Sequence, residues 1–558
     1  MTSTTTTTRS DTGADVESTD VIVLGSGAAG LTAALTARIE GADVVVLEKG
    51  ELVGGTSAWS GGALWVPVNP KAAEAGLHDA REDALAYIDS LSNGMIDPAM
   101  AAVFVDTGAE MVTYLEANTP MVFELVPGFP DYQPEQPGGK PRGGRSLQAA
   151  LFPFDQLGEW RTRVTVGRQL GANAAGVNMA LSETPLGHTA PEGVPADELA
   201  RRKVHDERGM GQALVGRLLK GLLDRGVEPR LEHRAVRLVV EDGRVVGVVT
   251  STRDGEVELR ARLGVVLATG GFEWDPELVR AFLRGPLERP VSVPTNTGDG
   301  LRMAMRVGVS LGTMREAWWT ATIDVPDQHG NTIPWMVNGE RTRPRTIMVN
   351  REGKRFANES ANYNAFGAAF HQIDPVRFDY GNLPAWMIFD RGYVERYGLG
   401  TWRGEGETPS WITVAESLPA LAIELDIAPA ALVATVERWN ANVAEGHDPD
   451  FHRGESAHDQ WWGDPALTGS TMASLGPLDT APFHAVRVYP AALGTKGGPR
   501  TTGHAQVLDV DGQPIPGLYA AGNAAASVFG MTYGGAGGTL GPACVFGYRA
   551  GRHLTSTA

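Results

Sequence analysis

The sequence predicts an α/β fold in which a parallel sheet carries several glycine-rich turns at one edge. Three short apolar runs each end in such a turn, within residues 21–27, 265–271 and 516–523. A continuous apolar run is typical of a strand that is buried on both faces of a sheet. In open parallel sheets, ligands bind in the crevice at the carboxyl ends of the strands. The three turns therefore predict a ligand crevice along one sheet edge.

The first turn carries the spacing of a dinucleotide-binding unit. Gly25, Gly27 and Gly30 follow a buried strand and open a helix. They permit a tight turn, a close approach of the backbone to a pyrophosphate, and close packing of the helix on the sheet, while the helix N-terminus binds the phosphates. A second strand ends at Glu48, 23 residues after Gly25. A carboxylate there accepts hydrogens from a ribose diol, which argues against NADP.

Composition and charge limit the partners. The 558 residues carry a net charge of -18, which repels nucleic acid and anionic membrane surfaces. Cys544 is the one cysteine, so neither a disulfide framework nor a cysteine-built metal site is expected, and the histidines lack metal-ligand spacing. No apolar segment is long enough to span a bilayer. Residues 1–17 lack a secretory signal, so we expect a disordered leader and a cytoplasmic protein.

The remaining elements follow in chain order. Residues 54–62 are too rich in glycine for a helix or strand and predict a loop against the ligand. Apolar spacing predicts a helix over 83–118, whereas prolines and glycines exclude regular structure over 127–145. The pattern then predicts a helix at 211–225, strands near 227–240, 244–251 and 256–262, and the buried strand that begins at Val265.

A second domain is expected within the first. Between about 280 and 485 the elements become shorter and prolines, tryptophans and arginines accumulate. Residues 516–523 return to a short apolar strand with a glycine turn, and a final helix begins at about 541. We therefore predict a nucleotide-binding domain in two segments, 18–280 and 486–558, with an inserted α+β domain at 281–485.

Longer motifs give the chain a family resemblance. They lie at 129–135, 353–363, 489–498 and 522–548. With them the chain, from residue 19 to 555, resembles two-dinucleotide-binding-domain flavoproteins of the fumarate reductase and succinate dehydrogenase group. Within that group it is similar to the 3-ketosteroid dehydrogenases, most closely the Δ1 enzymes. The resemblance implies a Rossmann-like FAD-binding domain and makes the inserted domain the catalytic one.

The resemblance implies FAD that is held non-covalently, because the loop from Thr56 to Gly62 contains no histidine for attachment. Residues from every glycine turn are expected to contact this cofactor. They are Gly25, Gly27, Ala28, Ala29, Gly30, Glu48, Lys49, Gly55, Thr56, Ser57, Gly61, Gly62, Ala268, Thr269, Gly270, Gly522, Asn523, Thr539 and Leu540.

The resemblance also assigns the chemistry, which is desaturation of the C1–C2 bond of a 3-ketosteroid in steroid and lipid degradation. Tyr363 matches the tyrosine that removes the C2 proton, and Tyr132 matches its hydrogen-bonding partner. Tyr533 and the amide of Gly537 match the two donors to the C3 carbonyl, while flavin N5 accepts the hydride from C1. Since a free tyrosine has a pKa of about 10, we expect Tyr132 to lower the pKa of Tyr363. An external electron acceptor such as a quinone is expected.

Other positions bear on the substrate. Gly534 stands where the Δ1 enzymes usually have a proline, and Met531 stands where a polar or basic residue is common. Several apolar side chains are candidates for lining a steroid cleft, although for each of them the core is the expected place. These side chains are Trp318, Trp319, Trp335, Trp386, Phe529 and Met531.

Three alternatives stay open. A 3-ketosteroid Δ4-(5α)-dehydrogenase would use the same groups across C4 and C5. A fumarate reductase-like enoate reductase would need cationic side chains for carboxylates, for which Arg341, Arg343 and Arg345 are candidates, although a solvated face is the expected role of such a cluster. A flavin-binding electron carrier without turnover would not need the intact set of tyrosines.

Overall fold

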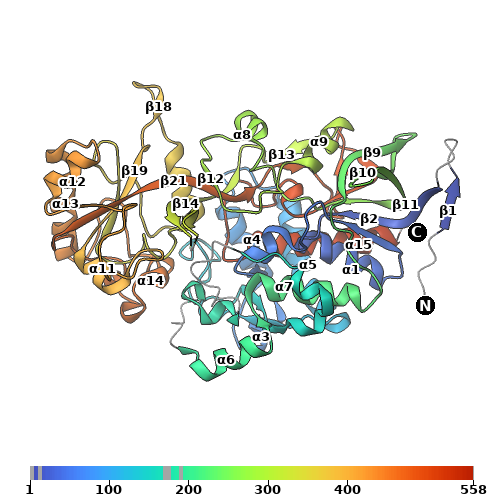
Figure 1. Cartoon of the computed structure of the whole chain (residues 1–558), viewed down its shortest axis with the longest axis horizontal. Helices are drawn as coiled ribbons and strands as arrows, with labels where there is room; N and C mark the ends of the chain where they lie inside the picture. Colours follow the sequence, from blue (N-terminus) through green and yellow to red (C-terminus); the bar gives the residue numbers. More distant parts are fainter. Residues whose placement is uncertain (1–5, 10–14, 168–177, 188–192, 328, 557–558) are drawn as a thin grey trace.

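The chain forms two lobes along one long axis (Figure 1). The computed structural model describes residues 6–9, 15–167, 178–187, 193–327 and 329–556. One lobe holds an eight-stranded sheet and both chain ends, and the other, yellow to orange in Figure 1, holds a seven-stranded sheet from the middle of the chain. The predicted fold class, a nucleotide-type α/β domain with an inserted α+β domain, is confirmed.

The eight-stranded sheet builds the predicted crevice. Strands β3, β2, β11 and β24 lie side by side and run parallel. Their carboxyl ends therefore meet at one edge, where the three glycine turns follow. The strands of this sheet are β1 (Thr6–Arg9), β2 (Asp15–Leu24), β3 (Val44–Leu47), β9 (Arg234–Glu241), β10 (Arg244–Thr252), β11 (Gly255–Leu267), β23 (Gln506–Leu508) and β24 (Pro514–Ala520).

Two helices with small residues pack closely beside this sheet. They are α1 (Ala28–Ile39) and α15 (Leu540–Ser556). A Cβ atom on Gly547 would lie 2.5 Å from the Ala29 oxygen, and one on Gly551 would lie 2.7 Å from the Ala33 oxygen. Because these contacts advance by four residues in both helices, the helices run in the same direction. Their positive N-terminal ends therefore lie at the same end of the lobe.

The seven-stranded sheet is mainly antiparallel and is held together by the long strand β21 (Phe483–Thr495). Its other strands are β12 (Arg289–Pro290), β14 (Ala317–Pro326), β15 (Thr332–Met336), β16 (Thr346–Asn350), β19 (Ala385–Asp390) and β20 (Thr413–Ala415). The helices of this lobe are α10 (Tyr363–Ala368), α11 (Arg391–Tyr397), α12 (Leu418–Glu424), α13 (Pro429–Ala444) and α14 (Ala457–Trp462). The expected domain boundary at 485 falls inside β21, which is one continuous strand.

Further helices and short strands connect and cover the two sheets. The helices are α2 (Gly55–Trp59), α3 (Pro70–Glu74), α4 (Arg81–Ser90), α5 (Pro98–Asn118), α6 (Ala196–Val204), α7 (Met210–Leu223), α8 (Pro276–Phe282) and α9 (Asp299–Arg306). The strands are β4 (Leu64–Trp65), β5 (Phe123–Leu125), β6 (Ser146–Ala149), β7 (Phe152–Pro153), β8 (Glu207–Arg208), β13 (Leu311–Gly312), β17 (Ile373–Asp374), β18 (Asp379–Tyr380) and β22 (Gly498–Pro499).

Several sequence-based boundaries need correction. The helix expected over 83–118 is two helices, α4 and α5, because Asn93 and Gly94 both adopt positive φ angles between them. The run 54–62 contains the short helix α2, which begins after Gly54 at φ +106°. The strands expected at 256–262 and from Val265 are one strand, β11, with an irregularity after Ala261. The strand expected at 227–240 begins only at Arg234.

Part of the expected leader is ordered. Residues 6–9 form β1, which pairs antiparallel with residues 15–18 of β2. The rest of the leader, residues 1–5 and 10–14, lies outside the described residues. Helix α7, strand β10, the irregular segment 127–145 and the helix at the C-terminal end agree with the predictions.

Candidate active site and cofactor site

The turn after β2 has the shape of a phosphate cradle. Gly25 has φ +103°, and a Cβ atom there would lie 2.3 Å from the Ala268 oxygen. A Cβ atom on Gly30 would lie 2.0 Å from the Gly25 oxygen, so neither position accepts a side chain. Gly27 is less crowded, with Ser57 Oγ as the nearest atom at 3.3 Å from its built Cβ. The backbone at Gly25 and Gly30 is therefore free of side chains at the N-terminus of α1, the kind of site that binds a pyrophosphate.

Glu48 lies at the end of β3 beside this turn. Its Oε2 accepts hydrogen bonds from the Ser26 amide at 3.1 Å and the Ser26 hydroxyl at 2.6 Å, and its Oε1 accepts one from the Gly50 amide at 2.8 Å. These bonds fix a half-buried carboxylate that has acceptor sites left for a ribose diol. The Lys49 ammonium binds Thr297 and Asp299 at 2.7 and 2.8 Å, and its contact with the cofactor stays a prediction.

The other predicted cofactor residues surround the same sheet edge. Gly54, Gly55 and Gly62 adopt positive φ angles around α2, and the Ser57 hydroxyl accepts a hydrogen bond from the Ala28 amide at 3.0 Å. The Thr56 hydroxyl accepts one from Asn296 at 3.1 Å. Thr269, at the end of β11, has a buried hydroxyl without a hydrogen-bond partner among the described residues. These features fit the adenosine diphosphate part of a dinucleotide.

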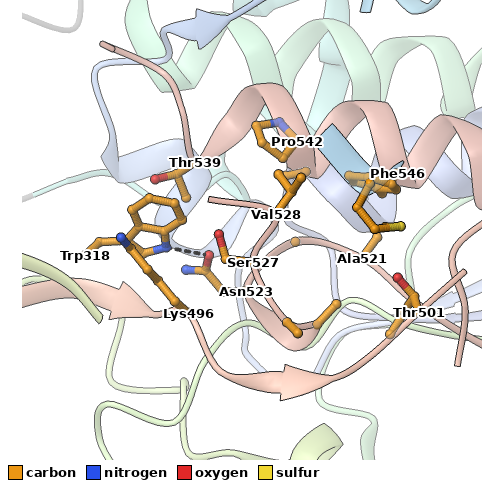
Figure 2. A pocket seen from close by; sticks show the side chains of 16 residues that line it. Trp318, Lys496, Thr501, Ala521, Asn523, Ser527, Val528, Thr539, Pro542 and Phe546 are labelled. Atoms are coloured by element: carbon orange, nitrogen blue, oxygen red, sulfur yellow. Dashed lines mark hydrogen bonds between the residues drawn. The ribbon is translucent and has the colours of Figure 1, made fainter. Parts of the chain in front are cut away.

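A cavity extends this region toward the second lobe (Figure 2). Gly522, Asn523 and Thr539, all predicted to contact the cofactor, line it together with Trp318 and Lys496. Trp318 Nε1 donates a hydrogen bond to Asn523 Oδ1 at 3.0 Å, so the cavity has walls from both lobes. Thr539 precedes the first turn of α15, whose N-terminal end favours negative charge. Leu540 opens that helix.

The three predicted tyrosines meet in one buried cluster. The ring centroids of Tyr132, Tyr363 and Tyr533 lie 5.1 to 5.5 Å apart in all three pairs. Tyr363 opens α10, whose first turn is capped by the Asn362 side chain. The Tyr533 hydroxyl lies 2.9 Å from the Thr539 hydroxyl, and its ring lies 4.7 Å from that of Trp318. The cluster is therefore adjacent to the cavity.

The pKa values of this cluster differ from the expectation. Burial raises the pKa of Tyr132 and Tyr363 well above the ordinary value and also raises that of Tyr533. Both neighbouring tyrosines raise the pKa of Tyr363 further, first through the charge of their ionised forms and then through side-chain hydrogen bonding. The expectation that Tyr132 lowers the pKa of Tyr363 is therefore wrong for this arrangement, in which the bond from Tyr363 lowers the pKa of Tyr132.

Gly537 lies near these tyrosines in a backbone conformation that excludes side chains. Its φ is +97°, and a Cβ atom would lie 2.5 Å from backbone atoms of Leu64 and Ala63. The Tyr132 amide donates a hydrogen bond to the Gly534 oxygen at 3.0 Å, and the Tyr87 hydroxyl donates to the same oxygen at 2.7 Å. These bonds join the proline-rich loop to the segment that carries Tyr533 and Gly537.

Sequence reasoning assigned no role to a charged network beneath Tyr132. Asp131 is buried and accepts hydrogen bonds from Trp65 Nε1 at 2.7 Å and from Arg145 at 2.8 Å. Arg145 also pairs with Asp79 at 2.7 Å. Asp131 belongs to the motif at 129–135, but only the fold reveals that its carboxylate is buried. The network holds the loop that presents Tyr132.

Two further polar residues near the tyrosines were not predicted. His458 is buried with its ring 5.2 Å from that of Tyr132, and neither ring nitrogen has a hydrogen-bond partner in the described part of the chain. Asn364 bridges β14 and the segment before Tyr533, since it accepts from the Trp319 amide at 3.2 Å and donates to the Met531 oxygen at 3.1 Å. Asn364 directly follows Tyr363 in the sequence, and this neighbourhood is the feature from which its place near the site could have been predicted.

The arginine cluster is not a solvated face, contrary to the expectation. Arg341 is buried, stacks on the Phe366 ring at 4.8 Å and donates to the Glu359 oxygen. Burial lowers the pKa of Arg341 to about 9. Arg343 stacks on the Tyr397 ring at 4.9 Å, and Arg345 pairs with Asp390. Packing and ion pairs within the second lobe account for these contacts.

Most of the candidate cleft residues are core residues, as expected. Trp318 alone among the six lines the cavity of Figure 2. Met531 is half-buried and receives a weak hydrogen bond from Asn93 on its sulfur. The hydrophobic cores contain or contact the rest, which are Trp319, Trp335, Trp386 and Phe529.

Clustered metal-ligating side chains and membrane-spanning helices are both missing from the described residues. These residues contain no group of three or more His, Cys, Asp or Glu side chains that could hold a metal ion. In the same part of the chain, every helix is too short or too polar to cross a membrane.

Comparisons with known proteins agree with this geometry. A family model described as FAD binding domain matches residues 20–540. The chain is 43% identical to 4-oxocyclohexanecarboxylate 2-dehydrogenase of Sinomonas cyclohexanicum, with 97% of this chain and 93% of that protein covered. It is 37% identical to 3-oxosteroid 1-dehydrogenase of Mycobacterium tuberculosis, with 97% and 99% covered. The crystal structure of 3-ketosteroid Δ1-dehydrogenase from Sterolibacterium denitrificans matches with a TM-score of 0.87, 32% identity and coverage of 97% and 100%.

Proposed function

The chain belongs to the FAD binding domain family, with the 3-oxosteroid 1-dehydrogenases among its relatives, and we propose that it desaturates the C1–C2 bond of a 3-ketosteroid ring. Its relatives show that the protein is an FAD-dependent oxidoreductase that acts on CH–CH groups of cyclic ketones. The observation that supports the proposal best is the buried cluster of Tyr132, Tyr363 and Tyr533 beside the cofactor cavity.

In the proposed mechanism, two donors polarise the ketone and one tyrosine removes a proton. The Tyr533 hydroxyl and the Gly537 amide donate hydrogen bonds to the ketone oxygen, which acidifies the adjacent C–H group. Tyr363 takes that proton, and Tyr132 holds the Tyr363 hydroxyl in place. Bound FAD supplies a hydride acceptor for the neighbouring carbon. The absence of histidine from 56–62 supports FAD that is held non-covalently.

Because burial raises the pKa of Tyr363, its deprotonated form needs compensation from the substrate complex. The phenol proton of Tyr363 must first leave to solvent, and the phenolate then takes the α proton of the ketone and becomes a phenol again, while the two donors stabilise the negative charge on the enolate oxygen. The dry surroundings strengthen both hydrogen bonds. A tyrosine with a raised pKa is thus compatible with a proton transfer that is concerted with hydride loss.

A second candidate substrate is 4-oxocyclohexanecarboxylate, the substrate in the name of a relative at 43% identity. This molecule has the same ring ketone and the same desaturation, so the tyrosines would have unchanged roles. Its carboxylate would need a cationic or hydrogen-bonding partner. The Δ4-(5α) position and an enoate reductase remain the further alternatives. For each of the dehydrogenase candidates we propose an external electron acceptor such as a quinone, whereas an enoate reductase would need an external electron donor.

Anaerobic mixing tests these alternatives together. The purified FAD-loaded protein is mixed with 5α-androstane-3,17-dione, whose C1–C2 and C4–C5 bonds are both saturated, or with 4-oxocyclohexanecarboxylate, and flavin bleaching and product mass are followed. Bleaching with loss of two hydrogens from the steroid supports the proposal, and the position of the new double bond separates C1–C2 from C4–C5. Bleaching by the carboxylate alone supports the second candidate. If neither ketone bleaches the flavin and fumarate reoxidises the chemically reduced protein, both dehydrogenase candidates are rejected in favour of an enoate reductase.

A further inference from the structure

Lys496 is a buried cation on the wall of the cofactor cavity. It directly follows β21 and is fully buried. Its ammonium donates a hydrogen bond to the Thr532 oxygen at 2.6 Å and lies 4.2 Å from the centroid of the Trp318 ring. Figure 2 shows Lys496 beside Trp318, with Asn523 and Thr539 on the same cavity. A positive charge therefore lies where residues predicted to contact FAD converge.

No carboxylate in the described part of the chain forms an ion pair with Lys496 within 4.0 Å, the ordinary limit for such a pair. Glu316 is the acid that acts on it electrostatically. The Glu316 carboxylate is engaged elsewhere, by Trp319 Nε1 at 3.2 Å and by Arg284 at 3.2 Å. Burial accordingly lowers the pKa of Lys496 to about 7, with Glu316 opposing this change. A buried ammonium without an adjacent anion is costly, and an anionic ligand would offset that cost.

The cavity wall indicates which ligand group faces this charge. Gly522 and Asn523 follow the parallel strand β24, and Thr539 precedes α15. The N-terminal end of α15, a helix of 17 residues, adds a second positive potential at the same cavity. The tyrosine cluster adjoins this cavity through Trp318 and Thr539. The flavin ring of FAD must lie next to that cluster, so that a hydride from a substrate bound at the cluster can reach the ring.

We infer that Lys496 raises the reduction potential of the bound flavin by stabilising the negative charge that the flavin ring gains on two-electron reduction. The inference requires FAD in this cavity but is independent of which ketone is oxidised. Two electrons and one proton arrive as hydride from the substrate, so the ring becomes anionic unless a second proton follows. Lys496 offsets that charge without transferring a proton itself.

A purely structural role of Lys496 predicts a reduction potential that does not depend on its charge. Lys496 also holds the segment before Tyr533 through the Thr532 oxygen, so its loss could displace Tyr533 and lower turnover without any electrostatic effect. Reduction potential separates the two roles because it is measured without substrate. Arginine at 496 keeps the charge and a donor, whereas methionine keeps much of the length and removes both.

The experiment measures midpoint potentials of the FAD-loaded protein by equilibration with a reference dye, without ketone. Lys496→Met is expected to lower the equilibrium constant for two-electron reduction about tenfold, which is about 30 mV toward negative potential. Lys496→Arg should stay close to the unsubstituted protein. Lys354→Met serves as the matched control, because the Lys354 side chain is 67% exposed and pairs with Glu352 at the surface.

An unchanged potential in Lys496→Met with FAD fully bound would overturn the inference. If that variant does not retain FAD, the affinities for oxidised and reduced FAD are measured separately by quenching of tryptophan fluorescence. A tenfold larger loss of affinity for reduced FAD supports the inference, and an equal loss for both states assigns Lys496 a structural role. Because neither measurement uses a substrate, failure here is distinct from failure of the proposed ketone oxidation.

Discussion

The hydroxyl of Tyr363 combines two properties that oppose each other. It is the proposed proton acceptor, yet burial and two neighbouring tyrosines raise its pKa. A buried phenol with a raised pKa is protonated in the free protein and accepts no proton in that form, whereas donors at the substrate oxygen make the bound ketone more acidic. The chemistry therefore depends on the cluster as a unit rather than on one activated tyrosine.

Tyr363→Phe removes the hydroxyl and keeps the ring packing. We expect the rate of flavin bleaching by the ketone to fall about 10²- to 10⁴-fold, because a positioned base contributes this much. The ratio of FAD to protein should not change. Tyr380→Phe is the control, because Tyr380 lies on β18 in the short β17–β18 pair and is not one of the three tyrosines of the cluster. Bleaching at an undiminished rate in Tyr363→Phe would exclude Tyr363 as the base.

Glu48→Ala tests the ribose contact. The Glu48 carboxylate is fixed by Ser26 and Gly50, so its loss removes both the proposed ribose acceptor and the bonds that shape the turn. A hydrogen bond to a charged group contributes about 1.5–3 kcal/mol, so we expect FAD affinity to fall at least about tenfold. The exposed Glu51, changed to Ala, is the control. Full retention of FAD through gel filtration by Glu48→Ala would contradict the assignment.

At this scale the sequence predicts the residues that lie in distinctive motifs. The three tyrosines and Glu48 occupy motif positions, and the tyrosines lie in one cluster while Glu48 lies beside the first glycine turn; their roles stay predictions. Burial is a property of the folded chain, so the buried charges of Lys496, Asp131 and Arg341 carried no signal of their own. The predicted direction of the Tyr363 pKa shift was wrong for the same reason, because the shift depends on burial and on the neighbouring tyrosines in the folded chain.

Among the elements, glycine turns and long amphipathic segments were predicted well. The breaks within segments were not, because they depend on single residues such as Asn93, whose positive φ separates α4 from α5. Strand β11 shows the reverse case, in which an irregularity after Ala261 is absorbed without ending the strand. Local preference is weak in both places, and pairing with neighbouring strands or helices decides the outcome.

Gly537→Ala tests the element that carries the oxyanion donors. The residue has φ +97°, and a Cβ atom would lie 2.5 Å from the backbone of Leu64. Strain of this kind costs about 1–3 kcal/mol, so a lower melting temperature and a displaced amide are expected together. Gly339→Ala is the control, because its Cβ would have no neighbour within 4 Å. A variant with unchanged melting temperature and bleaching rate would show that the backbone relaxes freely and that the amide is not needed.

For the whole molecule, β21 is the strand that joins the two functions. It begins in the core of the second lobe, where His484 stacks on Phe389 with ring centroids 5.2 Å apart. It ends at Thr495, immediately before Lys496 on the cofactor cavity. The expected domain boundary at 485 would divide this strand, because composition changes there while hydrogen-bonded pairing continues. The core of the second lobe and the cavity beside Lys496 are thus connected by one continuous strand.

The stability of this arrangement should depend on pH through His484. Burial lowers the pKa of His484 to about 4, whereas an unfolded histidine has a pKa of about 6.5. Between these values the unfolded chain binds the additional proton, so the free energy of unfolding rises with pH in this window. The contribution is fully present above about pH 6.5 and is lost as the pH falls to 4. It amounts to about 3 kcal/mol.

His484→Phe keeps an aromatic ring against Phe389 and removes the titrating group. We expect the variant to lose less stability than the unsubstituted protein between pH 7.5 and pH 5, measured by urea unfolding followed through tryptophan fluorescence. His78→Phe is the control, because His78 is exposed and should leave the pH dependence unchanged. Equal pH dependence in His484→Phe and the unsubstituted protein would mean that protonation of His484 is tolerated in the folded lobe. The acid sensitivity would then arise from carboxylates whose pKa the fold lowers, such as Asp79, whose ion pair with Arg145 weakens on protonation.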